Sequence, residues 1–498
     1  MTAQLSPSRS WRDSRIVPDQ VSRYMQAEHD FVDDAAIELA LRENTSPDPV
    51  RVREILAKSE AVQTLEPAET AALLHVRDPG LWEEMKQSAA RIKRKVYDNR
   101  VVTFAPLYLS NLCINNCLYC GLRSQNSAIQ RRTLTQDEVR LETEILAGKI
   151  GHKRLIVVYG EHSKSGVDYM AETLRTIYSV KVKARKGWGA IRRVNVNAPP
   201  MPVEELKILN DVGLGTYQVF QETYHRDTYG RVHPAGTIKS DYAWRLYSMH
   251  RAMEAGIDDV GIGALFGLYD WRFEVMGLLY HARELERAFG VGPHTISFPR
   301  IEPAEETPFV QDLKYRVSDE DMERAIVVIR LSVPYTGMIL TARENAGMRR
   351  RLLPLGCTQT DASSRIGIGA YSEAYESSRG ASEQFVLGDM RSLDEVVREL
   401  AEMGFITSFC TAGYRCGRTG QCIMDLLRSG KEGKFCKLNA VITFREWLDD
   451  FASPATQAAG EIVIQKELAE IQAQNPKGHD IFMQYYKRTA DGERDLYF

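Results

Sequence analysis

Residues 101–120 have the sequence Val101-Val-Thr-Phe-Ala-Pro-Leu-Tyr-Leu-Ser-Asn-Leu-Cys113-Ile-Asn-Asn-Cys117-Leu-Tyr-Cys120. The β-branched and aromatic run at the start predicts a strand, and three cysteines follow in the loop behind it. Three thiolates this close bind three irons of a cubane iron–sulfur cluster and leave the fourth iron without a protein ligand. An open iron is a position where a small molecule binds, so the pattern indicates catalysis more than electron transfer.

A structural zinc site is the alternative for these cysteines, with a fourth ligand from elsewhere in the chain. Zinc ligands usually form two Cys-x2-4-Cys pairs, or one pair with two distant histidines. The nearest downstream histidines are His152 and His162, well outside the cysteine group. The spacing therefore favours iron–sulfur over zinc.

Composition narrows the possible partners and compartments. The 64 basic and 67 acidic residues give a formal net charge of −3, which offers no electrostatic reason to expect a nucleic acid. The N-terminus lacks the apolar core of a signal peptide, and no apolar run approaches the roughly 20 residues of a membrane span. We therefore expect no membrane association and a reducing cytoplasm, where cysteines favour metals over disulfides. The eight cysteines are Cys113, Cys117, Cys120, Cys357, Cys410, Cys416, Cys422 and Cys436.

The hydrophobic pattern divides the chain into three regions. Residues 1–98 predict a polar arm and helices, residues 99–390 a barrel, and residues 391–498 a mainly helical auxiliary domain that contains the second cysteine group. Helix ends are indicated by the capping box Thr135-Gln-Asp-Glu138, by Ser318 and by Gly213. Strands are predicted at residues 101–105, 154–159, 194–196, 216–220, 259–265, 295–298, 338–341 and, more weakly, 364–369.

Eight strands that alternate with helices predict an α/β fold of the (β/α)8 TIM-barrel type. Active sites of such barrels lie on the loops that follow the strands. The three-cysteine loop follows the first strand, so we expect the cluster at this face.

Several longer stretches resemble one family. They are Tyr217-Gln-Val-Phe-Gln-Glu222-Thr-Tyr-His225, residues 241–246, Arg251-Ala-Met-Glu-Ala-Gly-Ile-Asp-Asp-Val-Gly-Ile-Gly263 and Gly292-Pro-His-Thr-Ile-Ser-Phe-Pro-Arg300. With the Cys-x3-Cys-x-Tyr-Cys loop, they are similar to the HydG-type radical S-adenosylmethionine (SAM) tyrosine lyases, the FeFe-hydrogenase maturase family. The likeness extends over about residues 90–450.

The resemblance implies a function. In that family a 4Fe-4S cluster with SAM yields a 5′-deoxyadenosyl radical, which takes a hydrogen from the amino group of tyrosine. Cα–Cβ cleavage then gives p-cresol and dehydroglycine, and a second cluster carries dehydroglycine onward to CO and cyanide. The implied partners are SAM, tyrosine, a reductant protein such as a ferredoxin or flavodoxin, and other hydrogenase maturases.

The resemblance also assigns residues in the barrel. It makes Cys113, Cys117 and Cys120 the ligands of the SAM-binding cluster. It places Gly160 and Glu161 at the SAM site, where glycine permits close approach and a carboxylate accepts hydrogen bonds from an ammonium group. An ordinary strand-end turn is the alternative for these two residues. The further residues expected to contact the cofactor are Tyr119, Asn195, Asn197 and Glu222.

Arg343 follows the seventh predicted strand. In relatives the equivalent arginine grips the carboxylate of the amino-acid substrate, a bidentate task that suits a guanidinium group. The alternative is a salt bridge with its neighbour Glu344 at the rim of the barrel.

The C-terminal cysteines depart from the family pattern Cys-x2-Cys-x22-Cys. Cys410 and Cys436 fall on the outer positions, but Gly413 occupies the middle one, and glycine cannot bind iron. Three interpretations remain: a shifted ligand set, a different metal, or a lost cluster with leftover thiols. The shifted set would be drawn from Cys410, Cys416, Cys422 and Cys436. Four thiolates would cap a cluster fully and remove the open iron that CO and cyanide formation needs.

A second departure lies at Asp361-Ala-Ser-Ser-Arg365-Ile-Gly-Ile-Gly-Ala-Tyr371, where the family usually has Ser-Ala-Gly-Ser-Arg and a Pro-Gly-Gly-Tyr ending. This change affects the floor of the pocket and therefore the choice of substrate. Another aromatic amino acid, such as tryptophan, is one alternative, and a non-catalytic iron–sulfur carrier or scaffold is another. Cys357 is most simply a small buried apolar residue.

Overall fold

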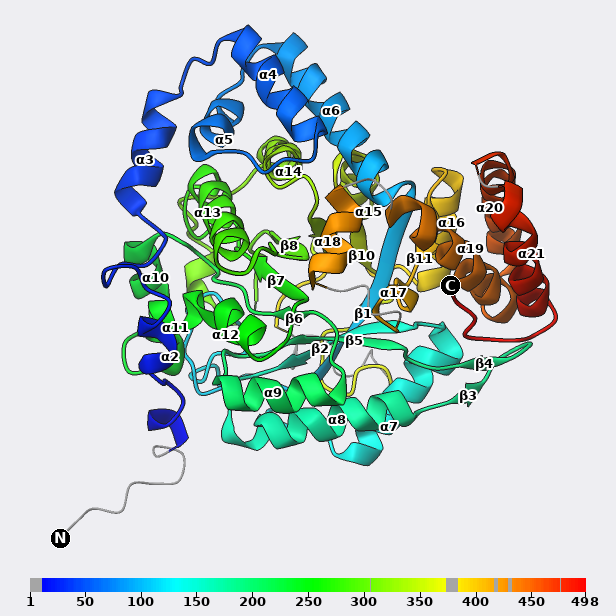
Figure 1. The fold of residues 1–498 in the computed structure, drawn as a ribbon. Coiled ribbons are helices and arrows are strands. Elements are labelled where there is room, and N and C mark those ends of the chain that lie inside the picture. Colours follow the sequence, from blue (N-terminus) through cyan, green and yellow to red (C-terminus); the bar gives the residue numbers. More distant parts are fainter. Residues whose placement is uncertain (1–10, 305, 373–383, 416–419, 429–431, 475) are drawn as a thin grey trace.

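The computed structural model describes residues 11–304, 306–372, 384–415, 420–428, 432–474 and 476–498. Eight parallel strands form a closed barrel, because the last, β10, pairs with the first, β1, through Val102–Gln359 and Thr103–Thr360. This confirms the predicted (β/α)8 TIM barrel (Figure 1). The strands are β1 (Arg100–Ser110), β2 (Arg154–Tyr159), β5 (Arg193–Asn197), β6 (Tyr217–Gln218), β7 (Val260–Gly263), β8 (Thr295–Ser297), β9 (Gly337–Leu340) and β10 (Gln359–Asp361).

Helices surround the barrel and bury their apolar faces on the strands, in one continuous core. Their starts follow the local signals: Thr135 and Glu138 form the predicted capping box, and Ser318 caps its helix. Gly213 has φ +81° at the end of α9, the left-handed conformation that favours glycine. The helices are α7 (Gln136–Glu144), α8 (Val167–Ser179), α9 (Val203–Val212), α10 (Arg226–Val232), α11 (Tyr242–Leu246), α12 (Ser248–Glu254), α13 (Trp271–Phe289), α14 (Asp319–Ser332) and α15 (Ala346–Leu352).

The eighth strand differs from the prediction. It consists of Gln359–Asp361, whereas residues 364–369 form an irregular loop and turn. The prediction was wrong because it sought an apolar run, and this strand is built from Gln, Thr and Asp. All three side chains are nevertheless buried. Asp361 lines the cavity inside the barrel, whereas Thr360 points outward and accepts a hydrogen bond from Arg349 on α15.

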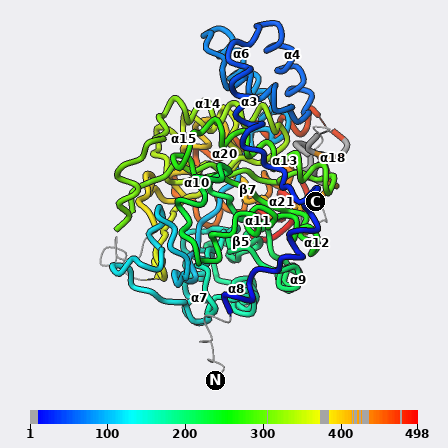
Figure 2. Tube along the Cα trace, turned by 90° about the vertical axis from the view of Figure 1, so that its left-hand side faces the viewer, coloured from blue at the N-terminus to red at the C-terminus, as the bar shows by residue number. Residues whose placement is uncertain are grey.

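α4 and α6 stand at the top of the molecule in Figure 2, whereas α2 lies beside α10 and α11 in Figure 1. α6 packs against α14, and α5 packs against α13 and α14. The helical pattern predicted for this region is confirmed, while the division of the chain into domains stays a prediction. These helices are α2 (Asp19–Ser22), α3 (Asp34–Glu43), α4 (Pro49–Glu60), α5 (Pro67–Leu74) and α6 (Pro79–Tyr97).

The C-terminal region lies beside the barrel next to the end of α6, which α18 and α19 contact, and it adds a ninth strand, β11, parallel to β1 but outside the ring (Figure 1). A buried ion pair joins it to the barrel: Lys153 Nζ lies 2.7 Å from Glu446 Oε1, and Arg192 binds the same carboxylate at 2.5 Å. Breaking such a pair leaves an uncompensated buried charge, so it holds the region in place. The elements are α16 (Leu393–Glu402), β11 (Ile406–Ser408), α17 (Ala412–Arg415), α18 (Gly420–Arg428), α19 (Glu432–Asp450), α20 (Pro454–Gln474) and α21 (Pro476–Ala490). A short hairpin, β3 (Val182–Lys183) with β4 (Trp188–Gly189), projects from the barrel.

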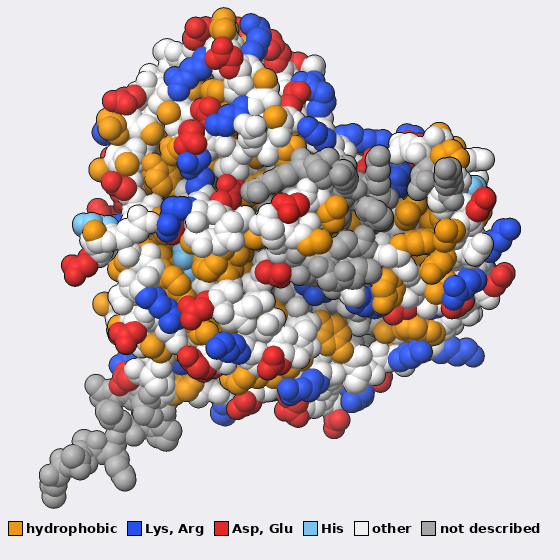
Figure 3. All heavy atoms as spheres, in the orientation of Figure 1, with side chains coloured by type: hydrophobic (Ala, Val, Ile, Leu, Met, Phe, Trp, Pro, Cys, Tyr) orange, Lys and Arg blue, Asp and Glu red, His pale blue; other side chains and the backbone are white. Residues whose placement is uncertain are grey.

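Basic and acidic side chains are interspersed on the face shown in Figure 3, in keeping with the small net charge. Among the described residues, no helix has both the length and the apolar character required to cross a membrane.

Candidate active site

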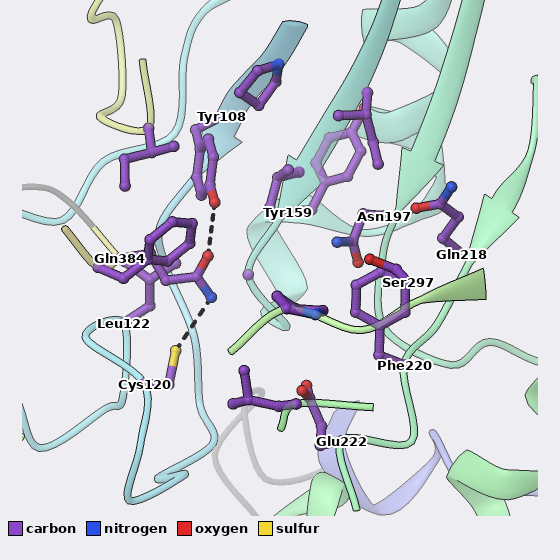
Figure 4. Close-up of a pocket in the computed structure, with 18 of the residues that line it drawn as sticks. Tyr108, Cys120, Leu122, Tyr159, Asn197, Gln218, Phe220, Glu222, Ser297 and Gln384 are labelled. Carbon is purple, nitrogen blue, oxygen red and sulfur yellow. Dashed lines mark hydrogen bonds between the residues drawn. The ribbon is translucent and has the colours of Figure 1, made fainter. Parts of the chain in front are cut away.

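A cavity of about 240 Å³ opens where the barrel strands end (Figure 4). Cys113, Cys117 and Cys120 all line it, so the structure brings the three thiols together at the expected face. The opposite wall carries Asn197, Phe220 and other strand-end residues of the barrel. The loop after the first strand therefore delivers the cysteines to the mouth of the barrel.

The cysteine loop is docked on Gly160. The Gly160 N–H donates to Ser110 O at 2.8 Å, and the Ile114 N–H donates to Glu161 O at 2.9 Å. A Cβ at residue 160 would lie 2.2 Å from Leu112 O and 3.3 Å from Cys113 Cβ. Only glycine lets the loop come this close, which explains the Gly-Glu step in structural terms.

The Cys117 thiol is buried and lies close to the other two cysteines. Burial raises the pKa of the Cys117 thiol to about 12, with Lys239 opposing the rise and Cys120 and Cys113 adding to it. Among the described residues, no three His, Cys, Asp or Glu side chains stand close enough for a single metal ion. A cubane gives each thiolate its own iron and spaces the sulfurs more widely. Three thiols that line one cavity match the three-ligand set of an iron–sulfur cubane.

Tyr119 lines the cavity but turns its hydroxyl away from it. The hydroxyl lies 2.8 Å from His233 Nε2, and the Leu118 N–H donates to Val232 O at 3.1 Å. Lys239 Nζ lies 5.5 Å from the centre of the tyrosine ring, within cation–π range. Tyr119 thus anchors the cysteine loop to α10.

Glu161 presents a carboxylate oxygen without a partner. Its Oε2 accepts a hydrogen bond of 2.5 Å from Asn115 Nδ2, whereas its buried Oε1 has no partner among the described residues. Burial raises the pKa of this carboxyl, against the effect of the Asn115 hydrogen bond. A buried acceptor left open is costly, and the ammonium group of SAM would satisfy it. This geometry fits the predicted SAM contact.

Glu222, in contrast, is already paired. Lys239 Nζ lies 2.6 Å and Arg245 Nη2 3.5 Å from Glu222 Oε1. Burial alone would raise the pKa of Glu222, but the two cations outweigh it and lower that pKa. The backbone of Glu222 has φ +74°, a strained conformation for this residue type. The carboxylate stays ionised and fixes Lys239 and Arg245 at the cavity wall.

Arg343 lines the same cavity, and its guanidinium lies 3.4 Å from the centre of the Phe385 ring. Its Nη1 donates to Arg300 O at 3.3 Å. The alternative of a salt bridge with Glu344 is wrong, because Arg300 holds Glu344, with Arg300 Nε 2.8 Å from Glu344 Oε1. Among the described residues, Arg343 has no carboxylate partner within salt-bridge distance. It is therefore ready for a carboxylate ligand.

The two predicted asparagines occupy different layers. Asn197 lines the cavity (Figure 4), but Asn195 lies outside its lining. The Asn195 side-chain oxygen accepts from the Thr216 N–H at 3.1 Å and from Arg154 Nη2 at 3.4 Å. Residues two apart on a strand share a face, so Asn195 points inward one layer deeper, toward the amino ends of the strands.

The stretch 361–371 forms part of the pocket, as expected. Asp361 and Ile366 line the cavity, and Asp361 Oδ1 accepts a hydrogen bond of 2.7 Å from the Ala342 N–H. This bond ties the end of β10 to the residue before Arg343, so the altered sequence bears directly on the substrate site.

The C-terminal cysteines are only partly brought together. Cys410, Gly413 and Cys436 line one small cavity of about 10 Å³, while Cys422 is exposed and Cys416 lies outside the described residues. Arg100 lines the same cavity at 3% exposure, and its Nε and Nη2 atoms have no partner among the described residues. Two buried guanidinium nitrogens that have no partner in the described ranges suit an anionic metal–thiolate centre, but Gly413 offers no third ligand.

Several site residues escaped sequence reasoning. Asn115 sits within the cysteine loop, where its spacing carries no known signal, and Lys239 lies in an unremarkable turn. Arg245 falls in the stretch 241–246 that resembles the family, so that stretch could have pointed to it. Tyr108 and Gln384 reach the site from positions far apart in the chain. Cys357 is fully buried, as expected, and burial raises its pKa to about 12.

Comparison with known proteins also indicates a radical SAM enzyme. Residues 107–276 match the Radical SAM superfamily and residues 297–406 the Biotin and Thiamin Synthesis associated domain. The 2-iminoacetate synthase of Escherichia coli (strain K12) is 32% identical over 335 residues, which cover 67% of this chain and 84% of that protein.

Two solved structures extend the likeness over nearly the whole chain. A crystal structure of HydG, a maturase of the [FeFe]-hydrogenase, shares 44% identity with a TM-score of 0.89 and covers 94% of this chain and 100% of that one. HydG from Carboxydothermus hydrogenoformans shares 33% identity with a TM-score of 0.74, over 90% and 98% of the two chains. The superfamily match implies a 4Fe-4S cluster and SAM as cofactors, and the donor set at Cys113, Cys117 and Cys120 fits them. The chain therefore belongs to the HydG-type family of radical SAM enzymes and is a radical SAM carbon–carbon lyase.

Proposed function

We propose that this enzyme cleaves the Cα–Cβ bond of L-tyrosine to p-cresol and dehydroglycine. One observation carries the proposal: Arg343, a cation without a carboxylate partner among the described residues, lines the same cavity as the three cluster cysteines. A guanidinium group binds a carboxylate through two parallel hydrogen bonds. Dehydroglycine is 2-iminoacetate, the product in the name of the Escherichia coli relative.

The chain's own residues divide the work. Cys113, Cys117 and Cys120 hold the cluster, and Glu161 accepts from the ammonium group of SAM. Arg343 orients the substrate by its carboxylate. When bound, the cluster and SAM supply a radical that removes one hydrogen atom from the substrate amino group, after which the Cα–Cβ bond breaks.

The cavity wall restricts what the radical meets. Phe220, Leu265, Ile339 and Phe385 line it with apolar surface. Apolar walls exclude water, and they also suit an aromatic side chain. Tyr108 and Ser297 add hydroxyl groups that provide hydrogen-bond partners for a phenol.

We further propose a second iron–sulfur cluster that uses Cys410 and Cys436. Two observations support it: the small cavity between them, and the buried Arg100, whose Nε and Nη2 atoms have no partner in the described part of the chain. The family's three-thiolate arrangement does not fit, because Gly413 has no side chain. Dehydroglycine, rather than CO and cyanide, is therefore the product we assign to the described residues.

Partners follow from the chemistry. Radical formation takes one electron, and the aromatic radical released by Cα–Cβ cleavage takes a second electron and a proton to become p-cresol. We therefore propose a ferredoxin or flavodoxin as the donor of both electrons, in a reducing cytoplasm. The likeness to HydG supports other hydrogenase maturases as further partners.

The test is an anaerobic reaction with reconstituted enzyme, reductant, SAM and a panel of tyrosine, tryptophan and phenylalanine, followed by mass spectrometry. We expect p-cresol from tyrosine only, and none from Cys117→Ala. Undiminished p-cresol from Cys117→Ala would sink the assignment of the cluster. A product from tryptophan in place of p-cresol would support the alternative aromatic substrate. A cluster that ignores SAM would indicate a carrier.

A further inference from the structure

Gln384 links a barrel strand to one of the cluster cysteines. Its Oε1 accepts a hydrogen bond of 2.7 Å from the Tyr108 hydroxyl, and its Nε2 donates to Cys120 Sγ at 3.5 Å (Figure 4). Its backbone carbonyl also accepts from the Gly121 N–H at 3.3 Å. Three contacts thus join Gln384 to β1 and to the cysteine loop.

The cysteine sulfur decides which way the Gln384 amide points. A thiolate that binds a cluster only accepts hydrogen bonds, so the NH2 end of the amide faces Cys120 Sγ and the Tyr108 hydroxyl donates to Oε1. The three residues therefore form a directional chain from Tyr108 through Gln384 to Cys120. Tyr108 lies on the buried strand β1, so the hydroxyl that donates to Gln384 is held by a rigid element.

The segment that carries Gln384 is itself pinned. The Val386 N–H donates to Pro303 O at 3.1 Å, and the Gly388 N–H donates to Ala342 O at 2.8 Å. Phe385, the next residue, stacks on Arg343. Adjacent side chains of one short segment therefore contact a cluster ligand and the proposed substrate arginine.

We propose that Gln384 is a positioning residue that holds Cys120 and raises the reduction potential of the cluster. A hydrogen bond to a cluster sulfur stabilises the added negative charge of the reduced form, so it makes the cluster easier to reduce. This goes beyond the lyase assignment, because it concerns the cluster alone and holds whatever the substrate is.

The test is an EPR-monitored redox titration of the reconstituted enzyme without SAM or amino acid. Gln384→Leu removes the donor, and Gln384→Glu replaces it with a group that accepts only. For each variant we expect the ratio of reduced to oxidised cluster at a fixed potential to fall about tenfold. This corresponds to a shift of about 59 mV to more negative potential for a one-electron couple. Val386→Ala, 58% exposed on the same segment, is the matched control and should leave the potential unchanged.

Iron content distinguishes a change in the reduction potential from loss of the cluster. If Gln384→Leu binds less iron, Tyr108→Phe decides, since it keeps Gln384 and removes only the group that orients its amide. A more negative potential in Tyr108→Phe at full iron content supports the proposal. Parental potentials in Tyr108→Phe, or in the Gln384 variants at full iron content, would overturn it.

Discussion

Replacing Arg343 should weaken the binding of tyrosine while the radical chemistry survives. The other two cations of the described cavity lining, Lys239 and Arg245, are both held by Glu222 and so cannot take over the substrate carboxylate. Two charge-assisted hydrogen bonds are lost in Arg343→Gln, for which we take a net cost of about 3 kcal/mol, or about a 100-fold rise in KM for tyrosine. Arg343→Lys keeps the charge but loses the planar fork, and about tenfold is expected.

The assay is the initial rate of p-cresol formation against tyrosine concentration, with 5′-deoxyadenosine measured in the same samples. Arg350→Gln is the matched control, because Arg350 lies on the neighbouring helix α15 with its side chain 62% exposed. SAM cleavage without tyrosine should be the same in all variants. An unchanged KM in Arg343→Gln, at equal iron content, would refute the role of this arginine.

Two further outcomes are expected. Gly160→Ala should lose most of the cluster iron, because the new Cβ would collide with Leu112 O. Gly230→Ala should keep its iron, because a Cβ there meets nothing within 4 Å. Equal iron in both variants would contradict the docking of the cysteine loop. Cys410→Ser combined with Cys436→Ser should lower iron by about one cluster while p-cresol formation continues; parental iron in the double variant would exclude a second cluster there.

The barrel could be predicted where strands carry apolar runs. β2 was found because its residues 155–158 form an unbroken run of aliphatic, mostly β-branched side chains. β10 was misplaced because a strand of Gln359-Thr-Asp361 has no such run, and its burial depends on hydrogen bonds that only the closed barrel supplies. The two-residue period of a strand could not distinguish the positions of Asn195 and Asn197. Both side chains face the inside of the barrel, and only their depth in it differs.

The site was predictable where a residue's role follows from its own chemistry and spacing. Cys113, Cys117 and Cys120 needed only the cysteine pattern. The roles of Gln384 and Tyr108 could not be found in this way, because they depend on a contact between residues 276 positions apart in the chain.

The ratio of p-cresol to 5′-deoxyadenosine tests the central claim most directly. It would be measured by mass spectrometry in an anaerobic reaction of the reconstituted enzyme with reductant, SAM and tyrosine labelled with ¹³C in the ring. Each radical should cleave one substrate molecule, so the account predicts ring-labelled p-cresol in a ratio close to one. Formation of 5′-deoxyadenosine with no labelled p-cresol would contradict it.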